Sequence, residues 1–232
     1  MRKKNGIKKL FLLIALVFCV SLTAKTGVSA ASSAKYTTKT KNLSKTYGSV
    51  TANVYYKRVV LKGKSDIVSK INKSIKADMN EFLSSDSVDT LYSCAKSANS
   101  AGWKDTYYYT ATSKVTYNGS GIISIQVTTM WYAGGVSNID RYGLTYDLKT
   151  GKKLNLVNVC SGNSTKVKTR VLNKIRKDSS SSQLNWTVLN AYPVKKMDFY
   201  INKNGNAVVC FGPYEIATGG WYRTFTIKSK YS

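Results

Sequence analysis

The chain has no histidine, and this absence removes several kinds of chemistry. A Ser or Cys nucleophile activated by an imidazole base cannot form, and zinc sites that combine histidine with cysteine are excluded. After the first 30 residues only Cys94, Cys160 and Cys210 remain, with no Cys-x-x-Cys spacing. We therefore expect no metal site, no cofactor and at most one internal disulfide. Cys210 lies in an apolar run and is predicted to be a buried thiol.

Acidic residues are also scarce. The chain has 11 Asp and Glu against 36 Lys and Arg, which gives a formal net charge of +25. Six of these basic residues lie within residues 1–30, so the remainder is still strongly basic. A field of this sign attracts wall teichoic polymers, anionic lipid surfaces, acidic glycans and nucleic acid. A Lys-rich surface that only keeps a secreted protein soluble accounts for the charge equally well.

Long apolar runs are absent except for one near the start. Residues 10–22 are apolar, follow a basic stretch and precede Val28-Ser29-Ala30, which indicates a secretory signal peptide cleaved after Ala30. A membrane-spanning helix needs about 20 apolar residues, so this run is too short for a stable anchor. The sequence therefore predicts a secreted, extracellular protein without a membrane span, and wall association is one alternative.

The rest of the chain predicts one α+β domain. Residues 31–48 are Ser, Thr, Lys and Asn and are expected to be a flexible segment, and residues 49–232 to be a single extracytoplasmic domain. Alternating β-branched and aromatic residues predict mostly antiparallel meander sheets, with two amphipathic helices packed on one face. The expected strands are 50–61, 107–117, 121–132, 142–148, 153–157, 197–201, 207–211 and 221–227.

Apolar spacing and turn chemistry predict the helices and turns. Ser65 is expected to cap a helix whose apolar face includes Ile71, and Ser164 to start a second helix. The stretch 84–102 is expected to be a polar connection. Asn118-Gly119 predicts a tight hairpin turn, and Asp147 with Gly151 predicts another.

Three segments in a fixed order resemble a bacterial family. They are Trp131-Tyr132-Ala133-Gly134-Gly135, then YDLKTGKKLNL at 146–156, then FYINKNGNAVVCFGPYEIATG at 199–219. This order resembles the extracytoplasmic domain of formerly unknown function in the outer part of RsiV-type, lysozyme-binding anti-sigma factors and the N-terminal half of PdaC-type peptidoglycan deacetylases. The resemblance covers residues 50–228. It implies a non-catalytic envelope module of α+β fold that binds cell-wall polymer, peptidoglycan or a secreted protein such as lysozyme. In the family an Ala-His pair commonly follows the two glycines, whereas this chain has Val136-Ser137.

Two aromatic pairs are the candidate ligand-binding residues. Each pair of rings adjoins two glycines and lies near an arginine, a setting in which rings stack on sugars or bases while guanidinium groups hold an anion. Glu215, beside Tyr214, is a further candidate, although a hydrogen bond that organises a turn explains it as well. The candidate residues are Trp131, Tyr132, Gly134, Gly135, Arg141, Tyr214, Glu215, Trp221, Tyr222 and Arg223.

Two alternatives stand beside the binding module. A general polyanion or nucleic-acid binder would follow from charge alone, without sequence preference. An envelope hydrolase is suggested only by Ser93-x-x-Lys96 and Lys149-Thr150-Gly151, motifs of penicillin-recognising enzymes. Here the second motif falls in an expected turn and the third motif of those enzymes is missing, so we expect no enzyme.

Overall fold

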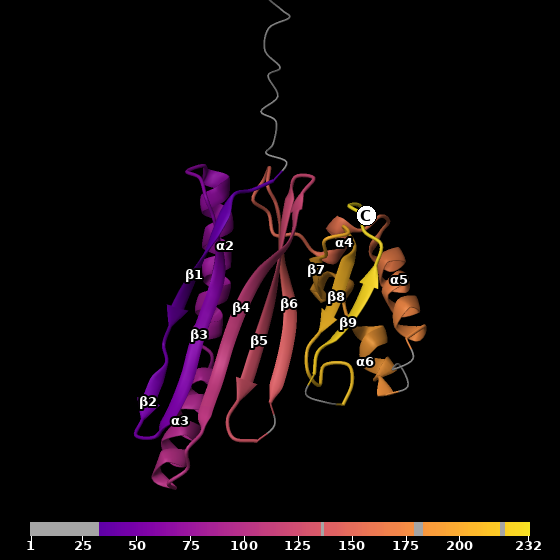
Figure 1. Cartoon of the computed structure of the whole chain (residues 1–232). Coiled ribbons are helices and arrows are strands. Elements are labelled where there is room, and N and C mark those ends of the chain that lie inside the picture. Colours follow the sequence, from indigo (N-terminus) through magenta and orange to yellow (C-terminus); the bar gives the residue numbers. More distant parts are fainter. Residues whose placement is uncertain (1–32, 136, 179–182, 219–220) are drawn as a thin grey trace, which may run out of the picture. The chain divides into compact units, whose positions relative to one another are not determined.

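The computed structural model describes residues 33–135, 137–178, 183–218 and 221–232, which belong to one compact unit. The predicted signal peptide, residues 1–30, lies outside these described residues, as do Gly219 and Gly220. The α+β class is confirmed: two mostly antiparallel sheets are accompanied by helices (Figure 1). None of the described helices is both long and apolar enough to cross a membrane.

The first sheet has the strand order β1-β3-β4-β5-β6, with the short β2 also paired to β3. Its strands are β1 Tyr36–Asn42, β2 Lys45–Tyr47, β3 Val50–Leu61, β4 Thr106–Gly119, β5 Ile122–Tyr132 and β6 Asn138–Asp147. All pairs are antiparallel except β3 with β4. A parallel pair needs a long crossover, and here two helices supply it, α2 Asp66–Leu83 and α3 Asp86–Ser100.

The helix α2 forms where apolar spacing predicted it. Ser65 is its N-cap, and the Ser65 hydroxyl accepts a hydrogen bond from the Val68 amide. Ile71 is fully buried against the first sheet together with the other members of the same helical face. The prediction of a polar connection over 84–102 is wrong, because α3 occupies most of it. Its buried face consists of Val88, Leu91, Ala95 and Ala98, two of which are alanines that give a weak apolar signal.

The prediction that 31–48 is flexible is also wrong for the strands β1 and β2. The seven residues of β1 pair with β3 from Tyr36↔Leu61 to Asn42↔Tyr55. Every side chain of β1 is exposed. An edge strand held by backbone hydrogen bonds carries no apolar alternation, and composition therefore does not reveal it.

The β4–β5 hairpin is present, but its turn lies two residues later than predicted. Ser120 and Gly121 have φ of 50° and 77°, whereas Asn118 and Gly119 are paired within the sheet. The Asn118 amide group instead exchanges two hydrogen bonds of 2.8 Å with the Ala34 backbone. The Asn118 side chain therefore holds the backbone at Ala34, near the first described residue, against the end of β4.

The turn at Asp147 is confirmed. Its Oδ1 accepts hydrogen bonds from the Lys149 and Thr150 amides, and Gly151 has a φ of 67°. The expected return strand at 153–157 is reduced to one bridge between Tyr146 and Lys153. The chain then enters a short helix whose N-cap is Asn155. The Asn155 side chain accepts a hydrogen bond from the Asn158 amide, which has no partner within the helix.

The second sheet has the order β7-β8-β9 and carries its own helices on one face. Its strands are β7 Asp198–Ile201, β8 Ala207–Phe211 and β9 Arg223–Ile227, and its helices are α4 Leu156–Val159, α5 Ser164–Arg176, α6 Trp186–Ala191 and the 3₁₀ turn η2 Val194–Lys196. The helix α5 is the second predicted amphipathic helix, although Asn163 rather than Ser164 caps it. Val167, Val171 and Ile175 are buried against this sheet. Each predicted amphipathic helix thus packs on a sheet, α2 on the first and α5 on the second.

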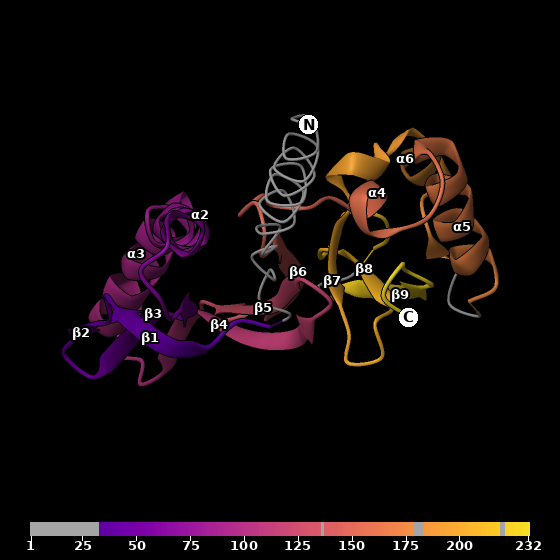
Figure 2. The ribbon, with the colours of Figure 1, turned by 90° about the horizontal axis from the view of Figure 1, so that it is seen from above.

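The two sheets meet at β5 and β6. Gly143 of β6 lies so close to β7 that a β-carbon there would be 1.8 Å from the Phe199 carbonyl oxygen. The Ser124 hydroxyl of β5 accepts a hydrogen bond of 2.8 Å from the Ile201 amide. Figure 2 shows β7 beside β6 and the helices α2 and α3 on one side of the first sheet.

Candidate functional site

Trp221 lies at the edge of β6 and is exposed. It forms a parallel bridge with Ile139, and the Tyr222 amide donates a 3.2 Å hydrogen bond to the Ile139 carbonyl. The Trp221 side chain is 64% exposed. The backbone of this segment is therefore held against β6 while the indole stays exposed. A ligand role for Trp221 and Tyr222 stays a prediction.

Arg141 joins β6 to the Trp221 segment. Its guanidinium carbon lies 4.2 Å from the centroid of the Tyr222 ring, a cation–π geometry. Burial raises the pKa of Tyr200, and the charge of Arg141 with a hydrogen bond between the two side chains opposes that rise. Among the described residues, the buried Nε of Arg141 and the buried Oδ1 of Asn138 have no hydrogen-bond partner. The Nε is shielded from solvent, so it is a hydrogen-bond donor of a charged group that the described part of the protein leaves unused.

Two adjacent hollows open beside these rings. The first, of about 370 Å³, is lined by Thr218, Trp221, Tyr222 and Arg223. The second, of about 460 Å³, shares Thr218 with the first and includes Tyr214 and Glu215 in its lining. Five of the predicted residues thus line these hollows. Arg141 stacks on one of these residues, Tyr222.

Glu215 organises its turn, as the alternative interpretation of the sequence proposed. One carboxylate oxygen accepts a 2.6 Å hydrogen bond from the Gly212 amide, and the other accepts one from the Tyr192 hydroxyl. Tyr214 has a φ of 61°, an uncommon conformation for a residue with a side chain, and its ring is 61% exposed. The turn therefore stores backbone strain and presents an exposed ring.

The other predicted pair has a different environment. Trp131 is half-buried and packs against the apolar cluster of β3 and α3. The Tyr132 hydroxyl donates a 3.1 Å hydrogen bond to Asp105, and its ring stacks on Tyr108 with centroids 5.5 Å apart. Gly134 has a φ of 78°, and a β-carbon there would be 2.8 Å from the hydroxyl of Tyr107.

These contacts give Trp131 and Gly134 a packing role, whereas Gly135 faces open space. A ligand role for the residues of this pair stays a prediction. Backbone pairing brings the two aromatic pairs close together, because Trp131 pairs with Asn138 and the next residue, Ile139, bridges to Trp221.

Comparison with known proteins identifies solved structures of similar fold. No family model matches the chain, and no curated protein does. Among solved structures, a member of the DUF3298 family from Bacteroides fragilis has a TM-score of 0.54 and 13% identity, over 85% of this chain and 91% of that one. A DUF3298 family protein from Pseudomonas aeruginosa has a TM-score of 0.52 and 11% identity, over 86% and 93%. This chain shares its fold with DUF3298 proteins.

That fold belongs to a domain family of unknown function, and at these identities the likeness extends to the fold alone. The finer resemblance to RsiV-type anti-sigma factors and PdaC-type deacetylases stays a prediction. Within the described residues, no group of His, Cys, Asp and Glu is placed to hold a metal ion. The Cys94, Cys160 and Cys210 thiols are free, and Cys210 is buried as predicted.

The two hydrolase-like motifs lie far apart in the structure. Ser93 and Lys96 are on α3, which follows the end of α2, whereas Gly151 adjoins Ile67 at the start of α2. The 18 residues of α2 span about 27 Å at 1.5 Å per residue. The motifs therefore do not form one site (Figure 1).

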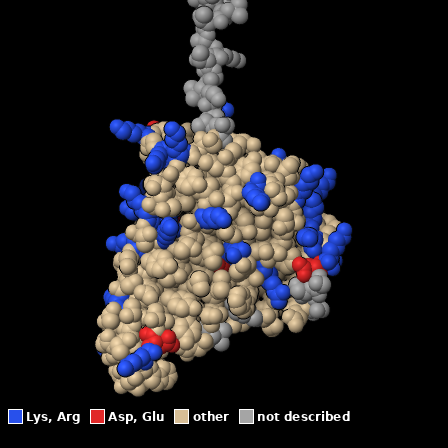
Figure 3. Space-filling view, viewed as in Figure 1, with Lys and Arg blue, Asp and Glu red and all other residues tan. Residues whose placement is uncertain are grey.

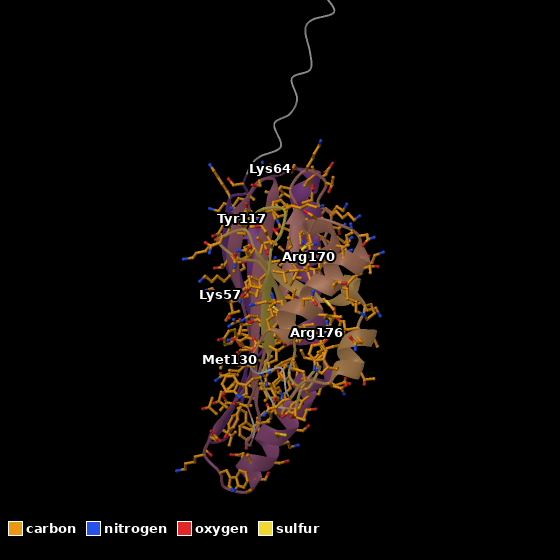
Figure 4. The ribbon with its side chains drawn as sticks, turned by 90° about the vertical axis from the view of Figure 1, so that its right-hand side faces the viewer. Lys57, Lys64, Tyr117, Met130, Arg170 and Arg176 are labelled. Carbon is orange, nitrogen blue, oxygen red and sulfur yellow. The ribbon has the colours of Figure 1, made fainter. Side chains whose placement is uncertain are left out.

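Sequence reasoning missed a second surface, the face of the first sheet opposite α2 and α3. We call it the open face and define it by Tyr55, Lys57, Tyr108, Thr112, Lys114, Thr128, Met130 and Tyr132. Figure 4 shows Lys57 and Met130 on the side of the sheet away from Arg170 and Arg176 of α5. The signal was present in the strand alternation, because side chains between the buried positions of β3 and β4 must point to the other face.

Proposed function

We propose that the protein is a non-catalytic binding module of the bacterial cell envelope that recognises an anionic wall glycopolymer. The observation that carries this proposal is the exposed Trp221 ring, which lines one hollow with Tyr222 and Arg223, while the Arg141 guanidinium group stacks on Tyr222. The predicted signal peptide supports a role outside the cytoplasm. The shared DUF3298 fold is compatible with this role and assigns none.

The chemistry of the site favours a sugar that carries an anion. An exposed indole offers a flat apolar surface to a pyranose ring, and a guanidinium group binds phosphate or carboxylate through two parallel hydrogen bonds. Arg223, which lines the same hollow, adds a second cation. The Trp221 backbone is held by its bridge to β6, the Arg223 backbone by its pairing with β8, and Arg141 by its stack on Tyr222, so less conformational entropy is lost on binding.

Two alternative functions predict different ligands from the one proposed. A general polyanion binder would take nucleic acid as tightly as wall polymer, with a steep dependence on salt. A partner protein such as lysozyme, which the family resemblance implies, would bind without any wall fragment present. Binding isotherms for wall polymer, single-stranded DNA and lysozyme at one salt concentration distinguish all three.

The test replaces one exposed tryptophan by alanine and compares it with another. Trp221→Ala should weaken binding of purified wall polymer about 5- to 150-fold, since a lost aromatic stacking contact is worth about 1–3 kcal/mol. Trp103→Ala is the matched control, because Trp103 is 60% exposed but lies in the α3–β4 connection. Isothermal titration calorimetry gives the affinities, and thermal melts confirm that both variants fold.

Equal affinities for the two variants would refute the assignment of the site to Trp221. Wall polymer that fails to bind the unaltered protein would refute the proposed function itself. A lower melting temperature for Trp221→Ala with unchanged affinity per folded molecule would show that the ring is structural.

A further inference from the structure

The five strands β1 to β5 contain no acidic residue. All 11 Asp and Glu of the chain lie in helices, in loops, in β6 or in the part that follows it. The same five strands carry six cations: Lys39, Lys41, Lys45, Lys57, Arg58 and Lys114. Figure 3, viewed as Figure 1, shows Lys and Arg outnumbering Asp and Glu on this face. The charge of these five strands is therefore of one sign, whereas β6 carries two aspartates and the helix α2 behind the sheet carries both signs.

The strand register connects this surface to the Trp221 site. One cross-strand row runs Lys57↔Thr112↔Thr128↔Arg141, from β3 to β6. Directly paired residues of a sheet point to the same face, so Lys57 and Arg141 lie at the two ends of one row.

A neighbouring row runs Tyr55↔Thr110↔Met130↔Ile139↔Trp221 and ends on the exposed indole. With neighbouring strands about 4.8 Å apart, its four steps span roughly 19 Å. Met130 is 39% exposed on this row. The open face thus leads into the candidate site without an intervening acidic side chain.

We infer that the open face is a track on which a linear phosphodiester-linked wall polymer lies across the strands, with one sugar at Trp221 and successive phosphates running toward Lys57 and Lys114. This inference rests on the proposed function and specifies its ligand as an extended chain. The Tyr108–Tyr132 stack lies on the other side of the Tyr55 row from Lys57 and Lys114 and adds a flat ring surface at the edge of the track, where the Tyr132 hydroxyl bonds Asp105. Lys57 and Lys114 are exposed and take part in no hydrogen bond recorded among the described residues, so their charges are available.

The inference predicts that affinity grows with ligand length. The probes are glycerol-phosphate oligomers of increasing length, each with one sugar at its end, titrated into the protein at fixed salt. Affinity should rise with each added phosphate until the oligomer spans about 19 Å and then level off. The Lys57→Glu, Lys114→Glu double variant should lower affinity at least tenfold for the long oligomers and leave the shortest unchanged.

The control makes the same change of charge on the opposite face. Lys73 and Lys76 are exposed on α2, so Lys73→Glu, Lys76→Glu alters the net charge equally but not the open face. This control should bind every oligomer within about twofold of the unaltered protein. An equal loss in both double variants would mean that only net charge matters and would overturn the inference.

The remaining outcomes separate the inference from the proposed function. Binding that is independent of length, yet still weakened by Trp221→Ala, overturns the track and leaves the proposed site standing. Absence of binding for every oligomer overturns both. Single-stranded DNA that binds as tightly as the longest oligomer, with the same sensitivity to Lys57→Glu, Lys114→Glu, overturns the identity of the polymer.

Discussion

At the residue scale, one carboxylate joins α2 to the first sheet. The Asp78 Oδ2 accepts hydrogen bonds from the hydroxyls of Tyr56, at 2.6 Å, and Tyr142, at 2.9 Å. Burial, more than the nearby charge of Asp78, raises the pKa of Tyr56, and it also raises that of Tyr142. Hydrogen bonds to a charged group contribute about 1.5–3 kcal/mol each, so this group holds the covered face of the sheet in register with the helix.

A third buried tyrosine of the covered face, Tyr146, predicts that the protein loses stability at alkaline pH. Burial raises the pKa of Tyr146 to about 12, the charge of Asp78 adds to the rise, and a hydrogen bond with Ser74 opposes it. The unfolded chain releases the proton near pH 10, whereas the folded chain keeps it until about pH 12. Stability is therefore complete below pH 10 and falls as the pH rises toward 12.

The measurement is the free energy of unfolding by denaturant at several values from pH 8 to pH 12. Tyr146→Phe should reduce the fall across this range by about 2 kcal/mol, because one raised pKa has been removed. Tyr36→Phe is the control, since Tyr36 is exposed on β1. Identical slopes for Tyr146→Phe and the unaltered protein would contradict the assignment.

At the scale of elements, α2 is the helix whose role can be tested most simply. Ile71 is fully buried in the apolar cluster between α2 and the first sheet, whereas Lys73, two residues on, is exposed to solvent. Ile71→Asp should lower the free energy of unfolding by at least about 3 kcal/mol, because a buried charge would have no partner. Lys73→Asp should change it by less than about 0.5 kcal/mol. Urea titrations of both variants decide the matter, and matching midpoints would mean that α2 does not pack on the sheet.

The elements that the sequence predicted are those with a strong periodic pattern. The strand β3 has the predicted bounds, and its buried residues alternate from Val50 to Tyr56. The apolar periodicity gave no signal for β1, which buries no side chain. It gave a weak signal for α3, whose buried face includes small residues. Turn chemistry gave the β4–β5 hairpin but not its exact turn, because Ser120 adopts the positive φ that Asn118-Gly119 was expected to provide.

The site was predictable as single residues but not as an arrangement. Glycine pairs, rings and arginines directed attention to Trp221 and Arg141, yet only the pairing of β6 with the segment at 221–222 brings them together. That pairing joins Ile139 and Trp221, which are 82 residues apart, and no local pattern encodes it. The open face was missed for the same reason, since its rows draw one residue from each of several strands.

At the scale of the whole molecule, the first sheet is covered on one face and open on the other, and the second sheet closes the end of the open face. The contact at Gly143 needs a residue without a side chain, because a β-carbon would overlap the Phe199 backbone. Arg141, two residues earlier on the same face, thereby meets Tyr222 from the segment that precedes β9. The proposed binding surface is thus built by both sheets together.

We propose that an anionic wall polymer lies on the open face and ends at Trp221. Backbone amide chemical-shift mapping by NMR, with purified wall polymer added to the protein, tests this most directly. The account predicts perturbed amides at Trp221, Tyr222, Arg141, Met130 and Lys57, and unchanged amides along α2 and α5. Perturbations confined to α5, or spread evenly over every exposed lysine, would contradict it.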